Sequence, residues 1–190
     1  MTILNLFSTP IKIISFPNFE EINKKIGKAM QLGFTNNFTD NLPTDEAIDL
    51  QKIFIDEAEL YLKEVSNQKI DLEIIKSWTS ITSKFGFNTP HCHADNTVVG
   101  VYYVRTFDKC GDLLLHDPRG AHSFVPKYEI NTDGYSVSDR LYHRITARCG
   151  QLVLFPAYIV HSVEPNMSDE VRISLAMNFK CKNFKQFKSD

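Results

Sequence analysis

The pattern of hydrophobic and polar positions changes near residue 70. Before it, apolar residues recur every three or four positions, which is typical of amphipathic helices. After it, short apolar alternations are broken by Gly, Pro, Asn and Asp, which is typical of strands joined by turns. We therefore expect one domain over 1–190, with a helical support region over 1–70 and a β-rich core over 71–190.

The first region predicts two helices. The stretch PNFEEINKKIGKAMQLG forms a helix ended by Gly33, with an apolar stripe made of Ile22, Ile26 and Met30. The stretch PTDEAIDLQKIFIDEAELYLKEV is a clearer helix, because Thr44 can cap it and Asp45 and Glu46 suit its first turn. Its apolar face consists of Leu50, Ile53, Phe54, Tyr61, Leu62 and Val65.

The second region predicts seven short strands. They cover 74–82, 98–105, 112–115, 144–146, 151–155, 159–163 and 171–179. Many short strands separated by turn residues indicate a sandwich or barrel, so the fold class is α+β but mainly β, with the helices packed on one outer face. The stretch from Arg119 to Leu141 has no clear period, and loops of that length are often binding loops. We expect it to be a lid over a substrate.

Composition narrows the classes of function. The chain has 190 residues, 43% of them hydrophobic, and a formal net charge of −2 without a basic stripe, so nucleic acid is not an expected partner. No apolar run is long enough for a membrane helix. The four cysteines form no CxxC pair, and the first residues do not read as a signal peptide. We expect reduced thiols and a cytoplasmic protein.

The stretch TPHCHADNTVVGVYYV carries three candidate metal ligands, His91, His93 and Asp95, at alternate positions. Alternate residues of an extended chain point to the same side, so any two of the three fit one site. His161 follows the apolar segment LVLFPAYIV and is a further candidate. We interpret His116 and His122 as ordinary core or surface residues, and His143 as a candidate substrate contact.

Arg172 and Ser174 lie two positions apart on an apolar strand, so their side chains lie on one face. A buried guanidinium is costly unless an anion compensates it. The pattern leaves two partners open: an internal Asp or Glu, or the carboxylate of a ligand held by a bidentate pair.

These features occur in an order that resembles a known family. The motifs are LFSTP at 6–10, Trp78, HCH at 91–93 with GVYYV at 100–104, the segment from Gly111 to Arg119, GQLVLFP with HSVEPN up to residue 166, and RIS at 172–174 with Asn178. The chain resembles the 2-oxoglutarate-Fe(II) oxygenases with a double-stranded β-helix, a jelly-roll or cupin-like core. The resemblance runs through nearly the whole chain, although Ala94 and Val99 depart from the family pattern.

The resemblance implies Fe(II) as the metal, with 2-oxoglutarate and O₂ as cosubstrates. It implies a triad of His91, His93 and His161, with Asp95 orienting an imidazole; the broader H-x-D pattern instead favours Asp95 over His91 as the third ligand. No catalytic residue is expected beyond the metal ligands. Arg172, Ser174 and Tyr103 would hold the far carboxylate of 2-oxoglutarate, whereas Tyr102 would pack on the opposite side. The candidates for lining the pocket are Trp78, Arg119, Asn178 and His143.

The implied activity is hydroxylation of an unactivated C–H bond of an amino acid, a peptidyl side chain or another small metabolite, with release of succinate and CO₂. Two other readings stay open. One is a cupin-like three-histidine metalloenzyme that does not use 2-oxoglutarate, against which the Arg172-x-Ser174 pair argues. The other is a barrel that binds a ligand without turnover. The substrate and the oligomeric state do not follow from the sequence.

Overall fold

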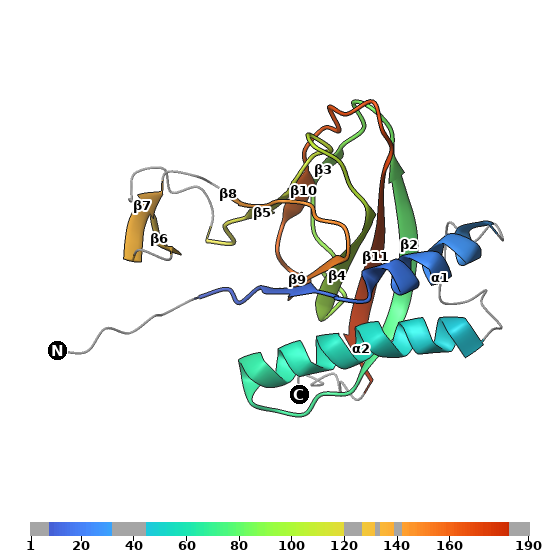
Figure 1. Cartoon of the computed structure of the whole chain (residues 1–190). Coiled ribbons are helices and arrows are strands. Elements are labelled where there is room, and N and C mark those ends of the chain that lie inside the picture. Colours follow the sequence, from blue (N-terminus) through green and yellow to red (C-terminus); the bar gives the residue numbers. More distant parts are fainter. Residues whose placement is uncertain (1–7, 32–44, 120–126, 132–133, 139–141, 183–190) are drawn as a thin grey trace.

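Two antiparallel sheets that face each other form the core of the computed structural model, which describes residues 8–31, 45–119, 127–131, 134–138 and 142–182 (Figure 1). The larger sheet has the order β1 (Lys12–Ser15), β9 (Gln151–Pro156), β4 (Val98–Arg105), β11 (Arg172–Cys181) and β2 (Leu72–Thr82). The smaller sheet has the order β3 (Asn88–His91), β10 (His161–Val163), β5 (Leu113–His116) and β8 (Tyr142–Ile145).

From β2 onward the chain crosses repeatedly between the sheets. It enters the smaller sheet at β3, returns at β4, forms β5 and β8, and crosses again at β9, β10 and β11. This winding of two sheets is a double-stranded β-helix, as predicted, and it closes a barrel around the apolar interior. All seven predicted strands are present, with ends that differ by a few residues.

The stretch from Arg119 to Leu141 contains a hairpin that the sequence did not predict. Strands β6 (Lys127–Asn131) and β7 (Gly134–Ser138) pair with each other and stand apart from the two main sheets (Figure 1). The signal was present but short: Tyr128 and Ile130, and then Tyr135 and Val137, alternate with polar residues on either side of a turn. The rest of the stretch, including His122, lies outside the described residues, and its role as a lid stays a prediction.

Two helices cover the outer face of the larger sheet, as predicted. Helix α1 (Phe19–Gln31) contributes Ile22 and Ile26, which are fully buried, and α2 (Asp45–Ser66) contributes Leu50 and Phe54. Each such side chain contributes about 1.5–3 kcal/mol when it leaves water. Met30 and Leu62 are partly buried against the same cluster. Gly33 and Thr44 lie outside the described residues.

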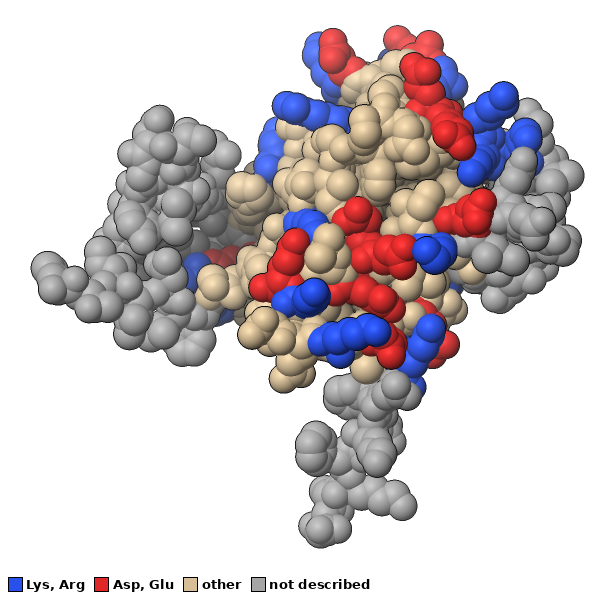
Figure 2. Space-filling view, turned by 60° about the horizontal axis from the view of Figure 1, so that its bottom comes forward, with Lys and Arg blue, Asp and Glu red and all other residues tan. Residues whose placement is uncertain are grey.

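The prediction that Val65 belongs to the apolar face of α2 is wrong. Val65 is 47% exposed, because the final turn of α2 extends past the buried contacts of Tyr61, whose hydroxyl donates to the Pro10 carbonyl at 2.9 Å. Around α2, acidic and basic side chains are interspersed over the surface (Figure 2). Lys12, for example, lies 3.0 Å from Glu64. No helix within the described residues is long and apolar enough to cross a membrane.

Strand β4 separates two adjacent tyrosines onto opposite faces. Tyr102 packs with Phe16 and Phe54 on the helical side, where its hydroxyl donates to Asn23 Oδ1 at 2.9 Å. Tyr103 belongs to the apolar cluster between the sheets. The predicted register of β4 is therefore confirmed.

Strand β1 is a further element that the sequence did not predict. It lies within the region expected to be helical and pairs with β9, with Ile13 opposite Val153. Four residues at a sheet edge, with Ile13 49% exposed, give too short an alternation to recognise. The four cysteines are free thiols, as predicted.

A candidate three-histidine metal centre

Three imidazoles converge at one end of the barrel. His91, His93 and His161 each offer one ring nitrogen, and these nitrogens lie within 4.8 Å of one another. Nitrogens bound at about 2.1 Å to one ion stand about 3 Å apart in a facial set, so small ring rotations would close the group around an ion. Within the described residues, no carboxylate joins them in such a group.

The strand register explains the convergence. His91 on β3 is paired directly with His161 on β10, and both side chains therefore lie on the same face of the smaller sheet. His93 follows the end of β3, and its backbone N–H donates to the Ala157 carbonyl at 3.0 Å, which fixes the chain beside β10. His161 is only 4% exposed, and the ring of Phe155 packs edge-on against it.

The outer ring nitrogens of the imidazoles are held in place. Nδ1 of His91 lies 2.7 Å from the Thr89 carbonyl, and Nδ1 of His161 lies 3.1 Å from the Ile159 carbonyl. A carbonyl only accepts, so both rings carry their proton on Nδ1 and keep a lone pair on Nε2. Hydrogen bonds of this kind fix the ring orientation of metal-binding histidines.

Burial keeps the imidazoles of His161 and His93 neutral. Desolvation lowers the pKa of His161 to about 4, outweighing the hydrogen bond to Ile159, and the neighbouring imidazoles lower it further. The pKa of His93 is also lowered, first by desolvation and then by His91 and Lys76. At neutral pH both rings are therefore uncharged, as metal ligands must be.

Asp95 does not follow the alternation expected from the sequence. The Asn96 N–H donates to the His93 carbonyl at 3.0 Å, so the chain turns after His93, and Asp95 is exposed in that turn. The alternation of an extended chain ends before it reaches Asp95. The Nδ1 atoms that Asp95 was expected to orient meet the Thr89 carbonyl, the Ile159 carbonyl and Asn178 instead.

A polar row leads along the inner face of the larger sheet. Arg172 and Ser174 on β11 both face the barrel interior, and Ser174 is paired directly with Tyr103 on β4. Asn178 lies on the same face of β11 and is 5% exposed. The structure therefore brings together the three residues predicted to hold a carboxylate, with Asn178 at the histidine end of their row.

Arg172 is a buried cation without an ion pair in the described part of the chain. It is 1% exposed and donates through its terminal nitrogens to the Cys110 and Gly111 carbonyls and to Thr82 Oγ1, at 2.9–3.1 Å. Its Nε has no partner. Desolvation lowers the pKa of Arg172, but a guanidinium stays charged in proteins. Among the described residues, no carboxylate pairs with Arg172, and the neutral acceptors around it do not satisfy every N–H. The Nε–H and the positive charge therefore remain available to an anionic ligand.

Tyr103 keeps its phenolic proton at this position. Burial raises its pKa well above the ordinary value, more than the Arg172 charge lowers it. A neutral phenol donates a hydrogen bond to a carboxylate. The three side chains thus offer a cation, a phenolic O–H and a hydroxyl to an anion in the barrel.

The remaining predicted pocket residues lie around the histidines in different ways. The ring of Trp78 lies 5.8 Å from that of His93, with the Lys76 ammonium over its face. His143 on β8 lies in one cross-strand row with His161, because each is paired with Leu115. Arg119 forms a bidentate pair with Asp117 through Nε and a terminal nitrogen, so its guanidinium is engaged within its own turn.

The groups that accept hydrogen bonds from Arg172 and from the histidine rings were missed in the sequence analysis. Thr82 is a direct partner of Arg172, and its alternation with Trp78 and Ser80 was the available signal for a shared face. The carbonyls of Cys110, Gly111, Thr89 and Ile159 have no signal of their own, because any residue carries a carbonyl.

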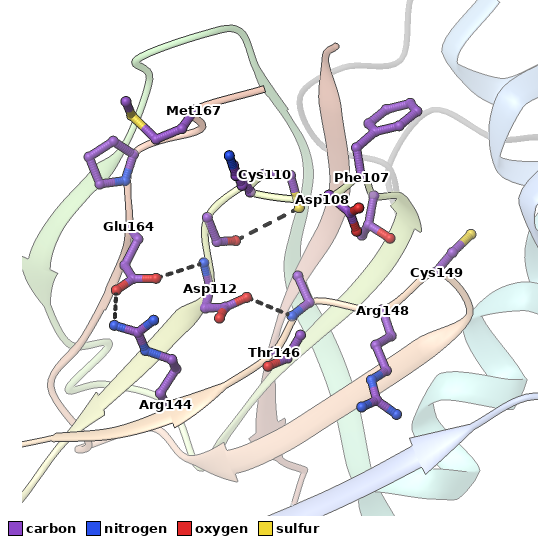
Figure 3. Close-up of a pocket in the computed structure, with 15 residues that line it drawn as sticks. Phe107, Asp108, Cys110, Asp112, Arg144, Thr146, Arg148, Cys149, Glu164 and Met167 are labelled. Carbon is purple, nitrogen blue, oxygen red and sulfur yellow. Dashed lines mark hydrogen bonds and ion pairs between the residues drawn. The ribbon is translucent and has the colours of Figure 1, made fainter. Parts of the chain in front are cut away.

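A separate cavity of about 780 Å³ is lined in part by the Cys110–Gly111 segment (Figure 3). Three of its charged residues form a network: Glu164 contacts Arg144 at 2.6 Å and accepts from the Asp112 N–H at 3.3 Å. Asp112 also accepts from the Ala147 N–H at 3.1 Å. This network fixes the cavity wall formed by the Cys110–Gly111 segment, whose two carbonyls accept from Arg172.

Replacing Gly111 by alanine is expected to lower the free energy of unfolding by about 3 kcal/mol, because its φ of +88° disfavours a side chain and a Cβ would collide with the Glu164 carbonyl. Chemical denaturation monitored by circular dichroism measures this. Gly27→Ala is the matched control: it lies in α1 with open space around it and should raise stability by about 0.5–1 kcal/mol. Equal effects of the two substitutions would contradict the role of the wall.

The comparisons with known proteins agree with this geometry. A family model described as "Putative 2OG-Fe(II) oxygenase" matches residues 76–178. No curated protein matches the chain.

Solved structures match the fold across most of the chain. A prolyl-4-hydroxylase from Pseudomonas putida is 15% identical to this chain. The aligned part covers 94% of this chain and 91% of the hydroxylase chain, with a TM-score of 0.62. HygX from Streptomyces hygroscopicus, solved with nickel and 2-oxoglutarate bound, is 10% identical, with coverage of 95% and 85% and a TM-score of 0.62. AviO1 from Streptomyces viridochromogenes is 13% identical, with coverage of 92% and 91% and a TM-score of 0.59. At these identities the likeness shows the double-stranded β-helix.

Proposed function

The chain belongs to the 2OG-Fe(II) oxygenase family, and from this premise we propose that it is an Fe(II)- and 2-oxoglutarate-dependent dioxygenase that hydroxylates an unactivated C–H bond. One observation carries the proposal. A buried arginine without an ion pair in the described part of the chain and a cluster of three histidines share one barrel. The first suits the far carboxylate of 2-oxoglutarate, and the second suits a divalent metal ion.

His91, His93 and His161 would hold Fe(II). Imidazole is a suitable ligand for iron, and three ligands on one side of the ion leave open positions for other molecules. Because all three ligands are neutral, the site keeps the full charge of the ion, which favours an anionic cosubstrate. Because the protons of His91 and His161 are fixed on Nδ1, their Nε2 atoms keep the lone pairs that would bind the ion.

Arg172, Ser174 and Tyr103 would hold the far carboxylate of 2-oxoglutarate. The free Nε of Arg172 supplies an N–H in a site where no described carboxylate forms an ion pair with the guanidinium, although Asp112 lies near enough to act on its charge. Charge-assisted hydrogen bonds of this kind are about twice as strong as neutral ones. Tyr103 and Ser174, paired across β4 and β11, add donors beside it.

When bound, Fe(II) with 2-oxoglutarate and O₂ would supply oxidative decarboxylation to succinate and CO₂, coupled to insertion of one oxygen atom into a substrate C–H bond. The protein contributes orientation and exclusion of water. Phe155 packs against His161 and belongs, with Val99 and Val153, to a fully buried apolar cluster between the sheets, which excludes water from that side of the site.

The substrate would be a small molecule or a peptidyl side chain. Trp78, beside His93, and His143, in one row with His161, are proposed to contact it, together with Arg119. The likeness to a prolyl-4-hydroxylase supports hydroxylation as the outcome, although the two chains are only 15% identical. Arg119 would have to leave Asp117 to meet an acidic substrate.

The test uses the purified full chain. Anaerobic addition of Fe(II) and 2-oxoglutarate should produce the visible charge-transfer band of the chelate, and admitting oxygen should produce succinate. Folded protein that binds metal but gives neither band nor succinate would refute the proposal.

A cupin-like three-histidine metalloenzyme that does not use 2-oxoglutarate is the second candidate. The all-histidine ligand set favours it, because carboxylate ligation is the more common arrangement at iron oxygenase sites. Turnover of a substrate without consumption of 2-oxoglutarate would establish it. A binding module without turnover, the third reading, would show ligand binding but no product.

The choice between His91 and Asp95 is tested by comparing two alanine variants. His91→Ala should lose Fe(II) binding and succinate formation, whereas Asp95→Ala should keep both within a few-fold, because Asp95 is exposed in a turn and is not part of the histidine group. Metal content after anaerobic loading and dialysis measures the difference. If Asp95→Ala alone loses iron, the three-histidine assignment is wrong.

A further inference from the structure

We propose that Asn178 is the positioning residue for His93: its side-chain oxygen accepts a hydrogen bond from Nδ1–H and thereby leaves Nε2 free to bind the metal. The inference rests on the metal site of the proposed function, but it does not depend on 2-oxoglutarate. It concerns how the protein prepares one ligand before any metal arrives.

His93 differs from the other two histidines in its outer contact. His91 and His161 each meet the carbonyl of the residue two positions earlier in the chain, an acceptor that depends on no side chain. His93 instead has Asn178 Nδ2 at 3.4 Å from its Nδ1. The proton position on His93 is therefore decided by a side chain that comes from another strand.

The arrangement of the amide leaves its acceptor unused. Asn178 is 5% exposed, and its Oδ1 has no hydrogen-bond partner. With the amide nitrogen facing the ring, His93 would accept at Nδ1 and carry its proton on Nε2, which cannot then bind a metal. A half-turn of the amide presents Oδ1 to the ring and places the amino group where the oxygen was. Binding through Nε2 requires that second orientation.

Asn178 and His93 meet beside an irregularity in the pairing of the larger sheet. The register of β2 and β11 shifts directly after Asn178, where Phe179 is paired with Ile74. The extra residue is Ile75 on β2, so β2 bends beside Asn178, and bulges are frequent beside active sites. The ring of Trp78 also packs against His93, with 5.8 Å between ring centroids, so the imidazole is contacted by both an aromatic ring and the amide.

Two substitutions separate this role from simple packing. Asn178→Leu keeps the approximate size but removes the acceptor, and Asn178→Asp keeps an acceptor that cannot donate. A carboxylate that accepts from a ligating imidazole strengthens the ligand. A residue that only filled space would tolerate leucine better than a buried charge.

The probe is Co(II), titrated into the metal-free full chain and followed by its visible absorption. We expect Asn178→Leu to weaken Co(II) binding by about 10- to 100-fold, the usual effect of losing such a partner, and Asn178→Asp to bind as tightly as the unmodified chain or more tightly. Met177→Leu is the matched control: this neighbour on β11 faces the helical side, so affinity should not change.

A second readout follows the proton directly. In ¹⁵N-histidine spectra of the Zn(II)-loaded protein, the His93 Nδ1–H should be protected in the unmodified chain and in Asn178→Asp, and lost to exchange in Asn178→Leu. Folded Asn178→Leu that binds Co(II) within about three-fold of the unmodified chain would overturn the proposal. So would Asn178→Asp binding more weakly than Asn178→Leu. Co(II) binding in the expected order without succinate formation would instead contradict the dioxygenase and leave Asn178 in its role.

Discussion

Alanine in place of His161 is expected to weaken binding of Fe(II) or Co(II) by more than about 100-fold, because loss of a direct ligand costs more than the 10- to 100-fold loss that follows removal of an outer partner. Succinate formation should fall with it. His161 is the most buried of the three ligands and the only one that touches both β3 and the Phe155 ring. Isothermal titration with Co(II) and succinate assays measure the two effects.

The control for this experiment is His116→Ala. His116 is a neighbouring histidine, but its Nε2 contacts Ser162 Oγ at 2.9 Å, on the outer side of the smaller sheet. The substitution should leave metal affinity unchanged. If folded His161→Ala bound Co(II) as tightly as the unmodified chain, these three histidines would not be the metal site.

Methionine in place of Arg172 is expected to weaken 2-oxoglutarate binding by about 100-fold or more, while metal affinity stays the same. Truncating a buried, hydrogen-bonded partner of a charge typically costs 2–5 kcal/mol, and Arg172 is the buried cation that faces the barrel interior beside Tyr103 and Ser174. The intensity of the charge-transfer band, measured anaerobically against 2-oxoglutarate concentration, gives the affinity. Arg172→Lys should recover only part of the loss, because an ammonium lacks the planar fork.

Arg105→Met provides a matched comparison. Arg105 is exposed and pairs with Glu170 at 2.9 Å, away from the barrel interior. Its loss should not change the affinity for 2-oxoglutarate. Equal losses from Arg105→Met and Arg172→Met would show that net charge, and not the buried site, determines binding.

Alternation along strands carried the correct part of the prediction from sequence. It separated Tyr102 from Tyr103 and placed Arg172, Ser174 and Asn178 on one face, because side chains alternate strictly about a strand. Helical periodicity likewise found the buried stripe of α1. These signals are local, so one sequence contains them.

What failed needed information that local patterns lack. Asp95 shares the alternation of His91 and His93, but a turn held by the Asn96 N–H ends it. For Arg172, the internal Asp or Glu is not found among the described residues, where two backbone carbonyls about 60 residues away in the chain and Thr82 accept from it. The ligand carboxylate stays a prediction. Contacts made by backbone atoms across a barrel depend on the final packing, and no residue type announces them.

The direct pairing of His91 with His161 gives a bound ion a second effect. The two residues are about 70 positions apart in the sequence and come from strands of only four and three residues. An ion held by both is a reversible cross-link that closes a long loop, and it stabilises the folded chain by about 2.7 kcal/mol at a concentration 100-fold above its dissociation constant. The stability of these two short strands should therefore rise with the concentration of free metal ion around the protein.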